Sequence, residues 1–588
     1  MNETPKAPEY HLGFYQSLVD HALAELKDTR IISRIWAHDH TVWKPDPTEI
    51  TNRLGWLHSP EVMAEEVERI TDFVKRVRMD GYTQALLLGM GGSSLAPEVF
   101  RKTFGVREGH LDLAVLDSTD PGAVLDYAGR LAPERSLFIV STKSGTTVET
   151  LSFFKFFYNW VKDWLGENRA GEHFIAITDP GSPLVELASR YRFRECFLND
   201  PNIGGRYSVL SLFGLVPAAL LGVDITRLLG SAMAMKGTCA ANNDRVEGNN
   251  PGAILGLALG ELAKSGRDKV TLICSPRTDE FGNWAEQLIA ESTGKEGRGI
   301  LPVVEESIGP PAVYGEDRLF VYMHLAGEKV HEETMAQIVR AGHPVVRLPL
   351  NGLYDLGGQF FLWEMAVAVA GHRLGINPFD QPNVEQSKAL ARQVAEEYKE
   401  KGSLPSEPPA LSSEGVAVYG EVTADTPAHA LKGFFDQAPS GEYIAIQAFV
   451  QPTSEVHDVL QRLRTALRER YRLATTLGFG PRYLHSTGQL HKGDAGKGLF
   501  LQFTADSPRD AEIPDEPGSN ESSMSFGVLK AAQAIGDRRA LLDRSRKVIR
   551  FHFEGDLIQG LKKLWKGSSA PHAGQTTVMW KGDGDDSD

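Results

Sequence analysis

Apolar positions recur along the chain in two patterns, one typical of amphipathic helices and the other of buried strands. Residues 10–26 and 60–77 carry apolar side chains at spacings of three and four, which predicts helices before residue 80. From residue 84 onward, short uninterrupted apolar runs take over. Such runs are typical of strands that are buried on both faces of a parallel sheet.

Seven of these runs lie in the first two thirds of the chain, and helical stretches such as 148–164 separate them. They are 84–89, 112–117, 136–141, 174–179, 270–274, 319–323 and 344–348. Short strands that alternate with helices build βαβ units. We therefore expect an α/β fold with two doubly wound parallel sheets, preceded by a helical region.

A third, weaker α/β pattern follows, with a helical stretch at 455–473 and apolar runs at 443–450, 499–503 and 548–553. Residues 506–523 are acidic and contain prolines, which indicates a surface loop. The predicted organisation is a helical region (1–80), two α/β domains (81–230 and 231–395), a Pro- and Ser-rich linker (396–415), a third α/β segment (416–566) and a polar, disordered tail without a site (567–588).

Composition narrows the choice of partners. The 588 residues include 62 Lys plus Arg and 77 Asp plus Glu, a net charge of −15. That excess repels nucleic acids and anionic membranes, but it allows a local basic pocket for a small anion. The three cysteines form no CxxC pair, which indicates a reduced, cytoplasmic protein. We expect no signal peptide, and no window approaches the ~18 apolar residues of a membrane span.

A glycine-rich segment, GMGGSSLAP, starts at Gly89 directly after the first apolar run. Consecutive glycines let backbone N–H groups approach a ligand closely. A dinucleotide fingerprint with Asp117 as the ribose acid fits poorly, because its last glycine is missing and Asp117 lies 28 residues after Gly89 rather than ~20. A tight strand-to-helix turn is the other alternative.

A hydroxyl-rich segment, STKSGTTVET, follows the third apolar run. Thr146 and Glu149 fit a capping box, so a helix is expected to begin here with Glu149 as a cap. Its free N–H groups and the hydroxyls of Ser144, Thr146 and Thr147 would point at one spot, with Lys143 nearby. Such a cup suits a phosphate monoester, although a well-capped helix without a ligand explains the same pattern.

Two further segments carry candidate catalytic groups. GGRYS presents Arg206 from a glycine turn, and a permanently charged arginine suits a developing oxyanion. WAEQLIAESTGK predicts a helix that ends at Gly294, with Gln287 and Glu291 on one face. Glu291 could then serve as a proton-abstracting base. Taken alone, each of these charged side chains also fits an ordinary solvated position.

Two more polar segments occur later in the chain. NPFDQPNVEQSK begins as a turn that carries Gln381 and continues into a helix from Val384, with Lys388 about one turn in. HSTGQLHKG is a loop whose histidines suit proton transfer. His485 and His491 could suggest a metal pair, but no third ligand with zinc-like spacing is evident, so no metal is expected.

These segments together resemble the phosphoglucose isomerase family, which is built from two sugar-isomerase (SIS) domains. The motifs are GMGGSS, STKSGTT, GGRYS, EQLIAESTGK, FDQPNVEQSK and LHSTGQ, over residues 85–390 and 485–489. The resemblance implies a cofactor-free isomerisation of glucose 6-phosphate and fructose 6-phosphate, through ring opening and a cis-enediol, in glycolysis and gluconeogenesis. It therefore implies a small sugar phosphate as the partner.

The resemblance also implies roles for individual residues. Those expected to bind substrate are Gly92, Ser93, Thr142, Lys143, Ser144, Thr147, Gln287 and Gln381. Glu291 would move the proton between C1 and C2, and Arg206 would stabilise the enediolate. Lys388 and His485 would act on the ring oxygen and its hydroxyl during ring opening.

The order of the motifs departs from the family. Its histidine motif normally lies between the glutamate and lysine motifs, whereas His485 follows Lys388 and the linker. This order resembles variant isomerases that are fused to a transaldolase in some bacteria, although no transaldolase domain is expected in the roughly 80 residues before the first sheet. In the usual homodimer the partner subunit supplies the histidine. The third segment could instead supply His485 in cis, so we expect a monomer, with a homodimer as the alternative.

Three other functions fit parts of the pattern. A dual phosphoglucose/phosphomannose isomerase would use the same enediol. A non-catalytic SIS regulator would keep the phosphate cup and lose the acid–base set, yet Arg206, Glu291 and Lys388 are all present. Isomerisation of an amino-sugar phosphate would normally come with a glutamine-hydrolysing domain, for which no N-terminal cysteine is seen.

Overall fold

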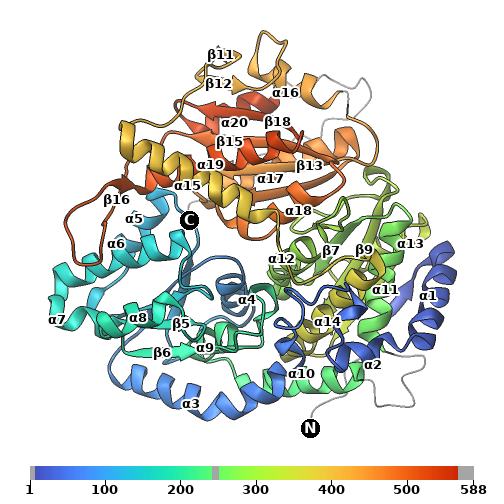
Figure 1. The fold of residues 1–588 in the computed structure, drawn as a ribbon. Helices are drawn as coiled ribbons and strands as arrows, with labels where there is room; N and C mark the ends of the chain where they lie inside the picture. Colours follow the sequence, from blue (N-terminus) through green and yellow to red (C-terminus); the bar gives the residue numbers. More distant parts are fainter. Residues whose placement is uncertain (1–6, 241–249, 437, 567–588) are drawn as a thin grey trace, which may run out of the picture.

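Three large sheets surround a common centre (Figure 1). The computed structural model describes residues 7–240, 250–436 and 438–566. In Figure 1 the first sheet lies at the lower left, the second at the right and the third at the top. A fourth, short sheet pairs β16 (Glu512–Ile513) antiparallel with β17 (Met524–Ser525).

The first sheet is wholly parallel, with the strand order β3-β2-β4-β5-β6. Its strands are β2 (Gln84–Gly89), β3 (Asp112–Leu116), β4 (Ser136–Ser141), β5 (Phe174–Thr178) and β6 (Glu195–Leu198). The first four coincide with predicted apolar runs. The fifth, β6, was not predicted, because it lies at the sheet edge and only one of its four residues is buried.

Helices cover both faces of the first sheet. Leu86 packs in one cluster with side chains of α6 (Val148–Leu165), and Leu87 packs in another with side chains of α3 (Ser59–Met79). The other helices of this part are α4 (Leu95–Phe104), α5 (Pro121–Arg130), α7 (Glu167–Ala170), α8 (Pro183–Arg190) and α9 (Leu212–Leu221). Successive residues of a strand thus face opposite helical layers, which confirms the predicted α/β fold with helices on both faces.

The second sheet has the order β1-β10-β9-β7-β8. The predicted runs form β7 (Lys269–Cys274), β9 (Arg318–Leu325) and β10 (Val345–Leu350), and β8 (Leu301–Val303) is a short addition. The helices that follow the first sheet are α10 (Ile225–Cys239), α11 (Pro251–Lys264), α12 (Phe281–Thr293), α13 (Glu332–Arg340) and α14 (Leu356–Leu374).

The N-terminal region differs from the prediction at its start. The helix expected from residue 10 begins only at Gln16, as α1 (Gln16–Asp28), followed by α2 (Ile31–Trp36). Residues Glu9–His11 instead form β1, which pairs antiparallel with β10 at the edge of the second sheet. A three-residue strand is too short to show a period, and its partner lies more than 300 positions away.

The third sheet has the order β11-β12-β18-β15-β13-β14. Strands β18, β15, β13 and β14 are parallel, whereas β12 is antiparallel to β18 and β11 is antiparallel to β12. Their bounds are β11 (Leu411–Ser413), β12 (Val416–Tyr419), β13 (Tyr443–Phe449), β14 (Ala474–Phe479), β15 (Gly498–Ala505) and β18 (Lys547–Phe553). The helices are α16 (Pro427–Phe435), α17 (Ser454–Tyr471), α18 (Gly488–Gly493), α19 (Phe526–Asp543) and α20 (Leu557–Lys566).

The predicted linker is partly a helix. Helix α15 (Val384–Lys401) continues through residues 396–401, and β11 begins at Leu411, so residues 402–410 and the turn at 414–415 are the parts of the predicted linker without helix or strand. In Figure 1, α15 lies along α19 of the third sheet, and the two helices are in contact. The error arose because Glu- and Lys-rich sequence is typical of exposed helices as well as of linkers.

The predicted surface loop at 506–523 is attached to the first sheet's helix α6. The ammonium group of Lys155 donates to the carbonyl oxygen of Asp515 (2.6 Å), and that of Lys162 donates to the carbonyl oxygen of Gly518 (2.7 Å). The segment therefore joins the first and third parts of the chain, which its composition did not reveal.

Some predictions are not tested by the fold. The tail, residues 567–588, lies outside the described residues, and the domain boundaries stay predictions. Across the described ranges, every helix is too short or too polar to cross a membrane.

Candidate active site

Two predicted loops leave the first sheet at the same edge. Strands β2 and β4 are adjacent and parallel, and they end at Gly89 and Ser141. Because the carboxyl ends of parallel strands open at one edge, the loops 91–93 and 142–147 both start there. The hydroxyl of Ser141 donates to the carbonyl oxygen of Ser93 (3.3 Å), which joins the two loops.

The predicted hydroxyls gather in the turn before α6. The hydroxyl oxygens of Thr142 and Thr147 are 2.8 Å apart, and those of Ser144 and Thr146 are 2.9 Å apart. Helix α6 begins at Val148, so its free N–H groups lie beside these hydroxyls. Anions are favoured at such a helix N-terminus, and the arrangement can accept a phosphate group.

Two details of this turn differ from the expectation. The ammonium group of Lys143 is bound to the carboxylate of Asp179 and to the carbonyl oxygen of Pro201 (3.0 Å), so its charge is already paired. The capping box does not form, because Thr147 occupies the N-cap position and Glu149 turns to another partner.

Glu149 contacts the third sheet's segment. The imidazole Nε2 of His485 lies 3.0 Å from Glu149 Oε1, and Gln533 of α19 donates to the same oxygen (2.7 Å). Burial by itself would raise the pKa of Glu149, but His485 and Lys388 supply positive charge that holds the pKa below its usual value. Glu149 is therefore a buried anion that orients His485.

Arg206 is fixed by acceptors at every guanidinium nitrogen. It is 2% exposed, its Nε donates to Ser292 Oγ (2.8 Å) and its Nη1 donates to Gln381 Oε1 (2.7 Å). Its Nη2 donates to the carbonyl oxygen of Pro378 (2.7 Å). The carboxylate of Glu291 lies 3.3 Å from Nη1, so a fixed positive charge stands beside the candidate base.

Helix α12 presents Gln287 and Glu291 on one face, as the spacing predicted. The amide nitrogen of Gln287 donates to Glu291 Oε2 (3.0 Å) and to the carbonyl oxygen of His485 (2.8 Å). The buried amide oxygen of Gln287 has no hydrogen-bond partner among the described residues. Gln287 thus links the candidate base to the histidine segment and leaves one acceptor free for a ligand.

The glycine-rich loop 91–93 packs backbone to backbone against the turn Gly205–Tyr207, which carries Arg206. A Cβ atom built on Gly92 would lie 2.0 Å from the carbonyl oxygen of Gly205, far inside any real contact. Only glycine fits at this position. The close approach places Ser93 and Arg206 on neighbouring loops.

Lys388 lies at the margin of this cluster. It is one turn into α15, as predicted, and its side chain is 36% exposed with the ammonium group 2.9 Å from Glu385 Oε1. Its charge acts on Glu149, but no contact with Glu291 or Arg206 is recorded among the described residues.

The contacts between these residues were not predicted. Glu149 was interpreted as a cap, and Ser292 and Gln533 were not singled out. His485 and Glu149 are 336 positions apart in the chain. No local pattern can signal a partner at that distance.

Comparisons with known proteins identify relatives of this chain. The family model for phosphoglucose isomerase matches residues 57–316. The glucose-6-phosphate isomerase of Symbiobacterium thermophilum is 30% identical over 389 residues, which cover 57% of this chain and 85% of that protein. The same enzyme of Rubrobacter xylanophilus is 28% identical over 384 residues, with 57% and 88% covered.

Two solved structures are similar to this chain in fold. A hypothetical protein of Thermus thermophilus superposes with a TM-score of 0.56 at 25% identity, covering 66% of this chain and 99% of that one. A glucose-6-phosphate isomerase of Chlamydia trachomatis gives 0.55 at 18% identity, covering 65% and 86%. The likeness to transaldolase-fused variants stays a prediction. With this sequence identity, coverage and fold, the chain belongs to the phosphoglucose isomerase family and is an isomerase.

Proposed function

We propose that the chain interconverts glucose 6-phosphate and fructose 6-phosphate by proton transfer through a cis-enediol. The observation that carries this proposal is the Glu291 carboxylate, 3.3 Å from the guanidinium of Arg206 and 3.0 Å from the amide of Gln287. A carboxylate beside a rigid cation suits removal of a proton next to a carbonyl group, because the cation stabilises the charge that develops.

The substrate's phosphate group would bind in the turn before α6. The paired hydroxyls of Thr142 and Thr147 and of Ser144 and Thr146 lie beside the helix N-terminus, where they can donate to phosphate oxygens. The phosphate anchor and the candidate base come from different sheets, so the sugar would span the space between them.

Ring opening needs one group that gives a proton to the ring oxygen and another that removes the proton of the C1 hydroxyl. His485 and Lys388 are proposed for this pair. The buried carboxylate of Glu149 lies 3.0 Å from the imidazole of His485, so it orients the ring and balances the charge of an imidazolium when one forms. Lys388, partly exposed at the margin, can approach a bound sugar without breaking a buried contact.

Glu291 would then take the proton from C2 of the open-chain aldose and return it to C1. A proton also passes from the C2 hydroxyl to the C1 oxygen, so the carbonyl group moves from C1 to C2 without net oxidation. The negative charge of the intermediate lies on O1 and O2. Arg206, already held by Ser292 and Gln381, can stabilise it with little rearrangement.

The test compares Glu291→Gln with Glu134→Gln in an assay of fructose 6-phosphate conversion that contains a chelator. Glu134 is exposed before β4, so it receives the same chemical change without a role in the site. Loss of the base should lower kcat by ~10² to 10⁴, whereas the control keeps its rate. A Glu291→Gln enzyme as active as the control would contradict the proposal. Mannose 6-phosphate in the same assay tests the dual-substrate alternative.

A further inference from the structure

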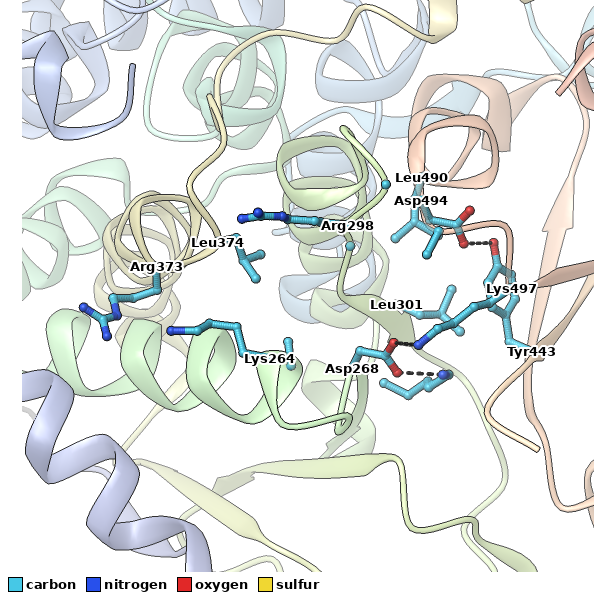
Figure 2. Close-up of a pocket in the computed structure, with 15 residues that line it drawn as sticks. Lys264, Asp268, Arg298, Leu301, Arg373, Leu374, Tyr443, Leu490, Asp494 and Lys497 are labelled. Carbon is cyan, nitrogen blue, oxygen red and sulfur yellow. Dashed lines mark hydrogen bonds and ion pairs between the residues drawn. The ribbon is translucent and has the colours of Figure 1, made fainter. Parts of the chain in front are cut away.

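A cavity of about 350 Å³ lies outside the proposed active site, where the second sheet meets the third (Figure 2). Its walls are the end of α11, the loop after α12, the end of α14 and the segment after α18. No residue of the proposed catalytic set lines it.

Cationic side chains dominate the lining. They are Lys264, Lys269, Arg298, Arg373 and Lys497, against two carboxylates, Asp268 and Asp494. Figure 2 shows Lys264, Arg298 and Arg373 around one end of the cavity, and Asp268 with Lys497 at the other. In a chain with a net charge of −15, this local concentration of positive charge favours an anion.

The charges at the two ends are balanced differently. At one end Asp268 accepts from Lys269 (2.6 Å) and Lys497 (2.6 Å), and Asp494 is paired with Arg546 (2.9 Å) outside the lining. These carboxylates are therefore already neutralised by neighbours.

At the other end, positive charge is left over. Lys264 and Arg373 share the carboxylate of Glu261 (2.9 and 2.5 Å), and Arg373 also contacts Glu25 (2.8 Å). The guanidinium of Arg298 is exposed and has no ion-pair or hydrogen-bond partner among the described residues. Three cations, Lys264, Arg298 and Arg373, thus face the two carboxylates of Glu25 and Glu261. Of the three cations, Arg298 offers a planar set of unpaired donors.

The walls of the cavity continue directly from the catalytic elements. Residues 297–299 follow α12, which carries Glu291, and residues 490–497 follow His485. The amide of Gly297 donates to the carbonyl oxygen of Gly493 (2.9 Å), so the two walls are bonded to each other.

A third connection reaches the turn that carries Gln381. In the loop after α12, the ammonium group of Lys295 donates to Asp380 Oδ1 (2.7 Å). Asp380 precedes Gln381, whose side chain holds Arg206. A ligand that draws Arg298 toward Lys264 would act on this same loop.

We propose that this cavity is a regulatory site for a compact anion with several negative charges, of the phosphate-ester or polyphosphate class. Such an anion would bridge the guanidinium of Arg298 and the ammonium of Lys264 by charge-assisted hydrogen bonds. Binding would change turnover through the loop after α12. That second part rests on the proposed isomerase function, whereas the binding does not.

The binding test uses pyrophosphate as the probe and equilibrium dialysis with saturating fructose 6-phosphate, which occupies the substrate's phosphate site. The wild type and an Arg340→Gln control, changed at an exposed arginine of α13, should bind the probe. Arg298→Gln and Lys264→Gln should bind it at least ~10-fold more weakly, as expected for loss of a charge-assisted contact. Equal binding in all four proteins, or none in the wild type, would overturn the site.

The regulatory test measures kcat at saturating fructose 6-phosphate with and without pyrophosphate. We expect pyrophosphate to change kcat in the wild type, and to do so much less in Arg298→Gln, whose basal kcat and KM stay unchanged. Purely competitive inhibition in both proteins would overturn the regulatory role. Binding that depends on Arg298 in a chain without isomerase activity would keep the site and refute the proposed function instead.

Discussion

Arg206 and Glu149 illustrate, at the scale of single residues, how the site is organised. Arg206 has an acceptor at each guanidinium nitrogen, and Glu149 holds the imidazole of His485 at 3.0 Å. Both charges are buried and paired, which keeps their geometry fixed. Sequence motifs identified Arg206 and His485 as candidates. The partner of His485 could not be predicted, because only folding brings Glu149 to it.

Glu149→Gln tests the role of that buried anion. The folded-state pKa of Glu149 lies below its ordinary value of 4.5, so its charge contributes stability that is lost as the pH falls through the folded-state pKa. The variant has no carboxylate at this position and therefore no such pH-dependent stabilisation. Its unfolding free energy should decline less steeply than that of the wild type below about pH 4.5. Denaturant unfolding from pH 3 to 7 measures the difference.

The same variant should also lower kcat near neutral pH by about 10- to 100-fold, because His485 loses its orienting charge. The pH profile of kcat should shift with it, which a purely structural role would not produce. Glu134→Gln, at an exposed position before β4, is the control. An unchanged pH profile in an enzyme that keeps its full rate would contradict the assigned role.

Helix α12 is the element on which the site depends most. One face carries Gln287 and Glu291 toward Arg206, and another carries Glu286 toward Ser486 of the third sheet's segment (3.4 Å). The spacing of its apolar residues, with the glycine that follows, was enough to predict a helix that ends at Gly294. The edge strands β1 and β11 were not predicted, because each is three residues long and belongs to a sheet only through a distant partner or a short neighbour.

Glu286→Gln tests the protonation state of a carboxyl group that is buried where α12 packs against the third sheet's segment. Burial and the charge of Glu305 raise the pKa of Glu286 to about 7, while Arg464, Arg482 and the Ser486 hydroxyl act in the opposite direction. The folded state therefore holds a proton that the unfolded chain releases above its ordinary pKa of 4.5, so this group costs stability as the pH rises toward 7.

Glu286→Gln has no carboxyl group at this position, so the loss of stability with rising pH that Glu286 causes is removed. Between pH 5 and 8 its unfolding free energy should fall less than that of the wild type, by ~2–3 kcal/mol. Denaturant unfolding at several pH values gives the slope, with Glu134→Gln, at an exposed position before β4, as the control. Parallel slopes for the wild type and Glu286→Gln would show that Glu286 is ionised in the folded protein.

At the scale of the whole molecule, three sheets contribute to one site. The first supplies the hydroxyl turn, Glu149 and Arg206, the second supplies Glu291, and the third supplies His485. Arg482, three residues before His485, lies 3.5 Å from the carboxylate of Asp117. The order of the motifs predicted that His485 would come from the third segment, but only the structure shows which groups it meets.

The central claim is that Glu291 and His485 of the same chain serve one active site. It is tested most directly by coexpressing Glu291→Gln and His485→Gln chains and measuring fructose 6-phosphate conversion by the purified mixture. If both groups act in cis, every site in the mixture lacks one of them, and the rate stays at the level of the single variants. Recovery to a substantial fraction of the wild-type rate would show that a partner chain supplies the histidine, and would contradict the account.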